Sequence, residues 1–144
     1  MKVLFDTSVL VAAMVQGHPS HRRALPWLRR AHSGELGFLV AAHTLAELYA
    51  TLTRLPTAPR ISPAVAARLV EANVASRALV VALDAADYGA LLRRWADLAV
   101  AGGAVYDGLI ARAAEKAGAD RLLTLNLEHF RRVWPEGAAS LTSP

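Results

Sequence analysis

The chain has 144 residues, which is enough for one domain with a substantial hydrophobic core. It contains no cysteine, so disulfides, thiolate nucleophiles and zinc–thiolate sites are excluded. The formal net charge is +4, which favours an acidic partner over a basic one. Hydrophobic residues make up 54% of the chain and the mean hydropathy is +0.29, which indicates a surface that a partner covers.

The first element is predicted by the uninterrupted apolar run Val3 to Phe5, which is typical of a parallel strand buried on both faces. Asp6 follows it directly, and residues 9–15 predict a short apolar helix. A carboxylate at this strand end is either a ligand at the sheet edge or only the N-cap of the helix. Asp6 also interrupts the apolar N-terminus, and the helix is too short to cross a membrane, so we expect a cytoplasmic protein.

The remaining elements alternate between strands and helices, which predicts an α/β fold with a mainly parallel sheet and right-handed crossovers. His18 and His21 lie at a predicted helix start, where a histidine without a metal is commoner than a metal site, and no third ligand is near them in the sequence. No linker or repeat divides the chain, so we expect a single domain over residues 1–144. The further strands are expected at 36–42, 78–83, 121–125 and 139–142, and the further helices at 20–32, 44–55, 63–76, 85–100, 104–117 and 127–130.

Glu47 has two possible roles. It follows Thr44 at the spacing of a capping box, in which the glutamate accepts a hydrogen bond from the threonine backbone amide. It also lies in the helix that follows the second strand, where it can reach the same sheet edge as Asp6. The sequence pattern alone leaves both roles open.

Asp107 lies on the helix face that is predicted to pack against the sheet, where its carboxylate would not be solvated. It shares the inward stripe with Ile110 and Ala114, so its charge needs a partner. Asn126 follows the fourth strand as Asp6 follows the first. Three carboxylates gathered at one edge repel each other unless they bind a hard divalent cation such as Mg²⁺ or Mn²⁺.

The chain resembles the PIN-domain nucleases, and in size and motif order the VapC toxins of bacterial toxin–antitoxin pairs. The matching segments are Phe5-Asp6-Thr7-Ser8-Val9-Leu10, Leu45-Ala46-Glu47-Leu48, Tyr106-Asp107-Gly108-Leu109-Ile110-Ala111, and Leu122-Leu123-Thr124-Leu125-Asn126 with His129-Phe130. The resemblance implies a three-layer α/β/α sandwich with strand order 3-2-1-4-5. It also implies a Mg²⁺- or Mn²⁺-dependent endoribonuclease, a homodimer, and an antitoxin that blocks the site.

By the same resemblance, Asp6, Glu47 and Asp107 are the catalytic residues. Asp6 and Asp107 would bind the metal, with Glu47 and Asn126 binding directly or through water. Ser8 and Thr124 would support them. Many relatives carry an acid where this chain has Asn126, so a second cation would be held less firmly here. Glu128, two residues further on, could contribute, although an exposed position is commoner at a helix end.

Two other functions are compatible with the motifs. One is an RNA-processing nuclease without an antitoxin, and the other is a non-catalytic domain that binds RNA or protein, which Asn126 favours. Four pairs of adjacent arginines suit contacts with RNA phosphates, although solvated helix faces explain them equally well: Arg22-Arg23, Arg29-Arg30, Arg93-Arg94 and Arg131-Arg132. A dinucleotide-binding domain is excluded because no G-x-G-x-x-G follows the first strand.

Overall fold

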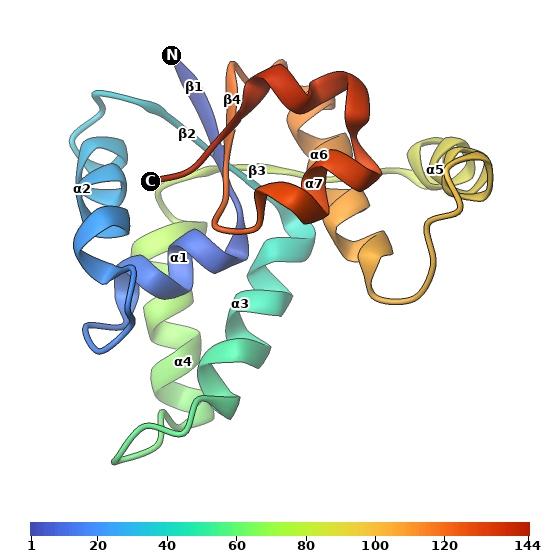
Figure 1. Ribbon diagram of the computed structural model, residues 1–144. Coiled ribbons are helices and arrows are strands. Elements are labelled where there is room, and N and C mark those ends of the chain that lie inside the picture. The colour runs from blue at the N-terminus through green and yellow to red at the C-terminus, as the bar shows by residue number, and fades with distance from the viewer.

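The computed structural model describes residues 1–144 and contains one five-stranded parallel sheet (Figure 1). The strand order is β3-β2-β1-β4-β5, which confirms the expected order. Each strand is paired in parallel with its neighbours. The strands are β1 (Lys2–Phe5), β2 (Gly37–Ala41), β3 (Leu79–Val81), β4 (Arg121–Leu123) and β5 (Leu141–Thr142).

β1 occupies the centre of the sheet because its residues are apolar on both faces. Val3 and Phe5 pack into one hydrophobic cluster, and Leu4 packs into the cluster on the opposite face. All three side chains are fully buried. The continuous apolar run in the sequence therefore predicted this strand correctly.

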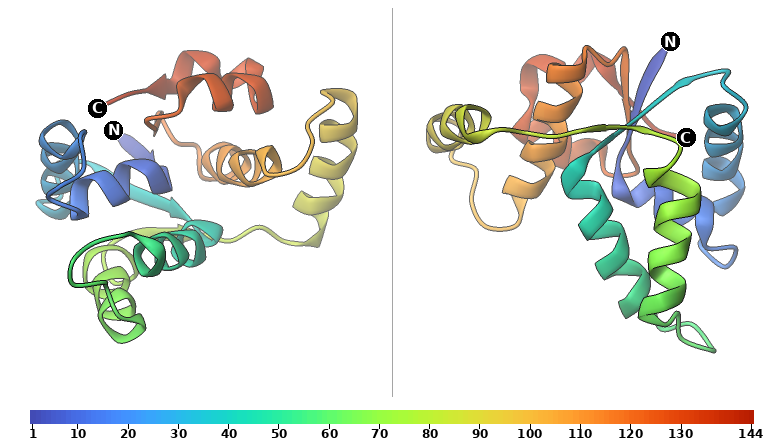
Figure 2. Two further views of the ribbon diagram at one scale, coloured as in Figure 1. Left: turned by 60° about the horizontal axis from the view of Figure 1, so that its bottom comes forward. Right: turned by 180° about the vertical axis from the view of Figure 1, so that it is seen from behind.

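Helices cover both faces of the sheet and complete the expected three layers (Figures 1 and 2). One face carries the first four helices, α4 continuing directly into a π-helical turn, and the other carries α6 and α7. Their bounds are α1 (Thr7–Met14), α2 (His21–His32), α3 (Ala42–Arg54), α4 (Pro63–Val70), the π-helix η1 (Glu71–Ala75), α6 (Ala104–Ala117) and α7 (Leu127–Val133). No helix has both the length and the apolar content needed to cross a bilayer.

Helix α5 (Ala85–Asp97) lies to one side of these layers and contacts mainly α6 (Figure 2). Leu91 and Trp95 form a small separate core with Leu109 of α6. Asp84 and Asp87 form a capping box at its start. Asp87 also binds Arg112 at 2.9 Å and Lys116 at 2.5 Å, and hydrogen bonding to Lys116 holds the pKa of Asp87 well below its ordinary value.

The C-terminal segment differs most from the sequence-based expectation. α7 continues to Val133, a 3₁₀ helix (η2, Pro135–Ser140) follows it, and β5 has only two residues. Pro135 ends the α-helix because it cannot donate a backbone hydrogen bond, yet it fits the first turn of the next helix. Gly137 lets the Trp134 ring lie against the backbone, since an added Cβ would meet Trp134 Cε2 at 1.9 Å.

Candidate active site

Asp6 lies just past the end of β1, at the sheet edge where β1 and β4 adjoin. It is 3% exposed, and both Ser8 Oγ and Thr124 Oγ1 donate to its Oδ2, at 2.5 and 2.8 Å. The two hydroxyls in turn accept the backbone N–H groups of Leu125 and Asn126. Asp6 occupies the N-cap position of α1, but its side chain makes no capping hydrogen bond. Its Oδ1 is left without a side-chain partner, so one oxygen of the fixed carboxylate can accept a ligand.

Glu47 is oriented by a residue far away in the sequence. Thr7 Oγ1 donates to Glu47 Oε2 at 2.8 Å. The capping box with Thr44, one of the two roles that the sequence left open, does not form, because β2 runs straight into α3 at Ala42 and Thr44 lies inside the helix. The Thr44 hydroxyl is buried without a hydrogen-bond partner. Glu47 is therefore positioned toward Asp6 and not toward the start of its own helix.

Asp107 lies in the first turn of α6, and its side chain is 21% exposed. Ile110, Ala111 and Ala114 are buried against the sheet, as the helical pattern predicted. The one basic side chain close to Asp107 is that of His129, whose Nδ1 lies 3.6 Å from Oδ2. No lysine or arginine forms an ion pair with Asp6, Glu47 or Asp107, so the charge of the three carboxylates has no permanent counterion.

These side chains meet at a single open cavity of about 400 Å³. It includes every predicted site residue except Thr124, which lies behind Asp6 as its hydrogen-bond donor. Glu128 is exposed and pairs with Arg131, so it takes no part. The lining residues are Asp6, Thr7, Ser8, Val11, His18, Glu47, Thr51, Asp107, Leu125 and Asn126.

The acidic groups are held in unfavourable surroundings. Burial raises the pKa of Asp6, the hydrogen bonds from Ser8 and Thr124 oppose this, and the charge of Glu47 adds to it. Burial and the neighbouring Asp6 raise the pKa of Asp107 to about 6, while His129 acts in the opposite direction. Strongly shifted groups in a cavity are typical of functional sites, and a bound cation would relieve both shifts.

The donors fit a hard divalent cation that retains water. No three acidic or histidine side chains are already close enough to hold one ion together. Mg²⁺ does not require that, because it usually keeps several waters and binds one or two carboxylates. Asp6, with its free Oδ1, and Asp107 are the direct ligands that this requirement favours, and Glu47 and Asn126 can bind through water. The set is composed of oxygen donors and suits zinc poorly.

The crowding of acids predicts an unusual pH dependence in the metal-free protein. A raised pKa means that the folded protein binds more protons than the unfolded chain, so stability falls as the pH rises from about 4 to about 6. Asp107→Asn should therefore stabilise the protein at pH 7.5 by about 1–2 kcal/mol, after allowance for solvent screening, and much less at pH 4.5.

Urea unfolding in EDTA at both pH values measures this difference. Asp97→Asn is the matched control, because Asp97 is exposed and forms no ion pair. An equal effect of Asp107→Asn at the two pH values would show that the carboxylate is not strained.

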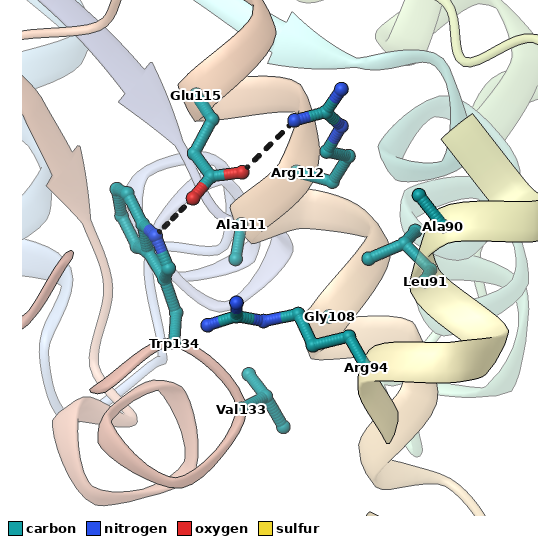
Figure 3. Close-up of a pocket in the computed structure, with 9 residues that line it drawn as sticks. All are labelled: Ala90, Leu91, Arg94, Gly108, Ala111, Arg112, Glu115, Val133 and Trp134. Carbon is teal, nitrogen blue, oxygen red and sulfur yellow. Dashed lines mark hydrogen bonds and ion pairs between the residues drawn. The ribbon is translucent and has the colours of Figure 1, made fainter. Parts of the chain in front are cut away.

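A second cavity lies between α5, α6 and α7, and Asp6, Glu47 and Asp107 are not among its lining residues (Figure 3). Glu115 links its walls, accepting hydrogen bonds from Trp134 Nε1 and from Arg112. Its one carboxylate is thus already satisfied, and Arg94 is paired with Glu136. The polar contacts around this cavity connect the helices, and they leave no unpaired charged group of the kind that a reaction site needs.

Two features of the site were missed at the sequence level. Thr7 orients Glu47, and its position directly after Asp6 was the available signal. His129 was part of a matching motif but was given no role, although its Nδ1 lies 3.6 Å from Asp107 Oδ2. Both contacts join segments far apart in the chain, which no local pattern reveals.

Comparisons with known proteins agree with this geometry. The family model for the PIN domain matches residues 3–134. Ribonuclease VapC40 of Mycobacterium tuberculosis is 42% identical over 122 residues, covering 85% of this chain and 84% of that protein. Ribonuclease VapC27 of the same species is 36% identical over 115 residues, covering 80% and 78%.

Solved structures share the fold at lower identity. The VapBC2 complex of Rickettsia felis on promoter DNA matches with a TM-score of 0.63 at 20% identity, covering 100% of this chain and 99% of the matched one. The FitAB complex on a DNA fragment matches with a TM-score of 0.67 at 19% identity, covering 99% and 94%. From the family match and the relatives above 30% identity, this chain belongs to the PIN-domain family.

Proposed function

We propose that the chain is a VapC-like endoribonuclease toxin that hydrolyses RNA phosphodiester bonds with Mg²⁺ or Mn²⁺. The observation that carries this proposal is the group of three carboxylates without a lysine or arginine partner, at one cavity on the sheet edge. The relatives named as VapC ribonucleases support the reaction class. In this proposal the single PIN domain spans residues 1–144 and acts in the cytoplasm.

The residues divide the work of hydrolysis among them. Asp6 and Asp107 would hold the cation, and Glu47 and Asn126 would complete its surroundings directly or through water. When bound, the cation supplies Lewis-acid stabilisation of the charge on the phosphate and a more acidic water. One of these carboxylates, Asp107 or Asp6, would orient the attacking water for in-line attack. In-line attack leaves a 5′-phosphate and a 3′-hydroxyl.

A further cavity of about 290 Å³ adjoins the acids and provides the positive charge that RNA requires. It is lined by Gly103, Ala104, Asp107, His129 and Arg132, and thus shares Asp107 with the acidic cavity. Arg132 forms no ion pair in the protein, so its guanidinium is available to a phosphate next to the scissile one.

Arg132→Ala should therefore weaken RNA binding and reduce the slope of log Kd against log salt by about 1. Arg131→Ala is the control, because Arg131 directly precedes Arg132 in α7 but is paired with Glu128. Fluorescence anisotropy of a labelled single-stranded RNA at several salt concentrations measures both variants. Equal slopes of log Kd against log salt in the two variants would show that Arg132 does not contact the RNA phosphates.

The partners are proposed from the surface and from the structural neighbours. The two neighbours named as VapBC2 and FitAB are complexes, and we propose a cognate antitoxin and a homodimer for this chain. Tyr49 and Val65 are large exposed side chains on α3 and α4, beside the connection 55–62 that we expect to contact the antitoxin. Light scattering of the purified chain alone and after co-expression with its neighbouring gene product tests both assemblies.

The function itself is tested with the purified chain and labelled single-stranded RNA. We expect cleavage with Mg²⁺ or Mn²⁺, no cleavage in EDTA, and products that ligate to a 3′-hydroxyl acceptor only through their 5′-phosphate. Asn126 favours one competing function, a domain that binds RNA without cutting it. RNA binding with no cleavage at any metal concentration would support that alternative and overturn the nuclease.

A further inference from the structure

Two aromatic rings from different helices stack at the border of the acidic cavity. His43 lies in the first turn of α3 and Tyr106 in the first turn of α6, and their ring centroids are 5.1 Å apart with an interplanar angle of 5°. His43 Nε2 lies 3.6 Å from Glu47 Oε2, and Tyr106 directly precedes Asp107. The pair is thus adjacent to two of the three carboxylates.

Packing does not account for Tyr106. Its side chain is among the large apolar groups that remain exposed, at 51%, and it belongs to none of the hydrophobic clusters. Its hydroxyl forms no hydrogen bond within the protein. His43 covers one face of the ring, yet about half of the side chain remains exposed, so a planar ligand can reach the ring.

An open aromatic face suits one part of an RNA strand. Proteins that bind single-stranded nucleic acid stack unpaired bases on aromatic rings, and every base can stack because each has a π-face. A phosphate at the acidic cavity brings its neighbouring bases within reach of the residue next to Asp107. The cavity at Arg132 would hold the RNA backbone, while the exposed tyrosine ring offers an apolar surface to a base.

We propose that Tyr106, backed by His43, stacks against an unpaired base next to the scissile phosphate. This inference rests on the proposed nuclease function and adds the part of the substrate that the protein holds by its base. It makes single-stranded RNA, or an unpaired loop, the preferred substrate, since a base inside a helix is already stacked on both faces.

The test uses Asp6→Asn protein, so that the RNA is bound without being cut, and a 12-nucleotide oligouridylate that carries one 2-aminopurine. The fluorescent base is moved along the strand, because stacking on an aromatic ring quenches it. We expect strong quenching at one position. Tyr106→Ala in the same background should abolish the quenching and raise Kd by about 5- to 150-fold, the range for one lost base stack.

Three controls separate stacking from folding. Tyr106→Phe should retain both quenching and affinity, because the ring remains and only the hydroxyl is lost. Tyr49→Ala removes another exposed tyrosine, on the face of α3 away from Glu47, and should change neither. An oligonucleotide that is abasic at the quenched position should bind with equal affinity to the Asp6→Asn protein with Tyr106 and to the one with Tyr106→Ala.

The outcomes distinguish this proposal from the function on which it rests. Unchanged quenching and a Kd within twofold in Tyr106→Ala would overturn the stacking role alone, as would an equal loss of affinity on abasic RNA. A protein that binds none of the oligonucleotides, and whose wild type cuts no RNA, would overturn the proposed function and this inference together.

Discussion

Asp6→Asn should abolish RNA cleavage while leaving the fold intact. The carboxylate is buried, two hydroxyls fix its Oδ2, and only Oδ1 is available to a ligand. Asparagine has nearly the same shape but removes the charge, so the side-chain atom left to face the cation would bind it far more weakly. Loss of a supporting residue around a metal typically costs about 10- to 100-fold, so loss of this ligand should cost at least about 100-fold.

Single-turnover cleavage at saturating Mg²⁺ measures the loss, and circular dichroism confirms the fold. Asp97→Asn is the matched control, an exposed aspartate on α5 that should keep the wild-type rate. Ser8→Ala and Thr124→Val each remove one hydrogen bond to Asp6. Their cleavage rates should lie between those of Asp6→Asn and Asp97→Asn. Wild-type cleavage by Asp6→Asn would show that the reaction occurs elsewhere.

Glu47→Gln should also lose most of the activity, because the glutamate faces the cavity and takes no part in a helix cap. Glutamine keeps the hydrogen bond from Thr7 but removes the charge. We expect a loss of at least about 10-fold in the rate and little change in the free energy of unfolding.

Thr44 provides the contrasting variant. Thr44→Val replaces a buried hydroxyl that has no partner with a methyl group, so it should keep activity and be neutral or slightly stabilising. Parallel measurements of cleavage and of urea unfolding separate the two residues. If Glu47→Gln were active and Thr44→Val were strongly destabilised, both residues would serve to cap the helix, and Glu47 would have no role in the reaction.

Much of the fold could be predicted because the patterns are strong along the chain. The apolar run at Val3 to Phe5 predicted a buried central strand, and Gly118 ends α6 in the left-handed conformation typical of a helix C-terminus. Asp107 was recognised by its place on an apolar helical stripe. These features depend on residues within a few positions of one another.

The features that could not be predicted depend on tertiary contacts. The Thr44–Glu47 spacing matches a capping box, but the helix starts at Ala42 because β2 ends there, and the local pattern did not decide the boundary. The Thr7–Glu47 hydrogen bond and the His43–Tyr106 stack join different elements. The position of α5 follows from its apolar contacts with Leu109 and from the ion pairs of Asp87 with residues of α6, which its own sequence does not indicate.

The central claim is that the carboxylates bind the divalent cation on which RNA cleavage depends. The most direct measurement is a calorimetric titration of Mn²⁺ into the metal-free protein, with RNA cleavage followed in the same samples. We expect cleavage to rise with metal occupancy in the wild type, and both binding and cleavage to be lost in Asp6→Asn. Full cleavage by the wild type in excess EDTA, or Mn²⁺ binding by Asp6→Asn at wild-type affinity, would contradict it.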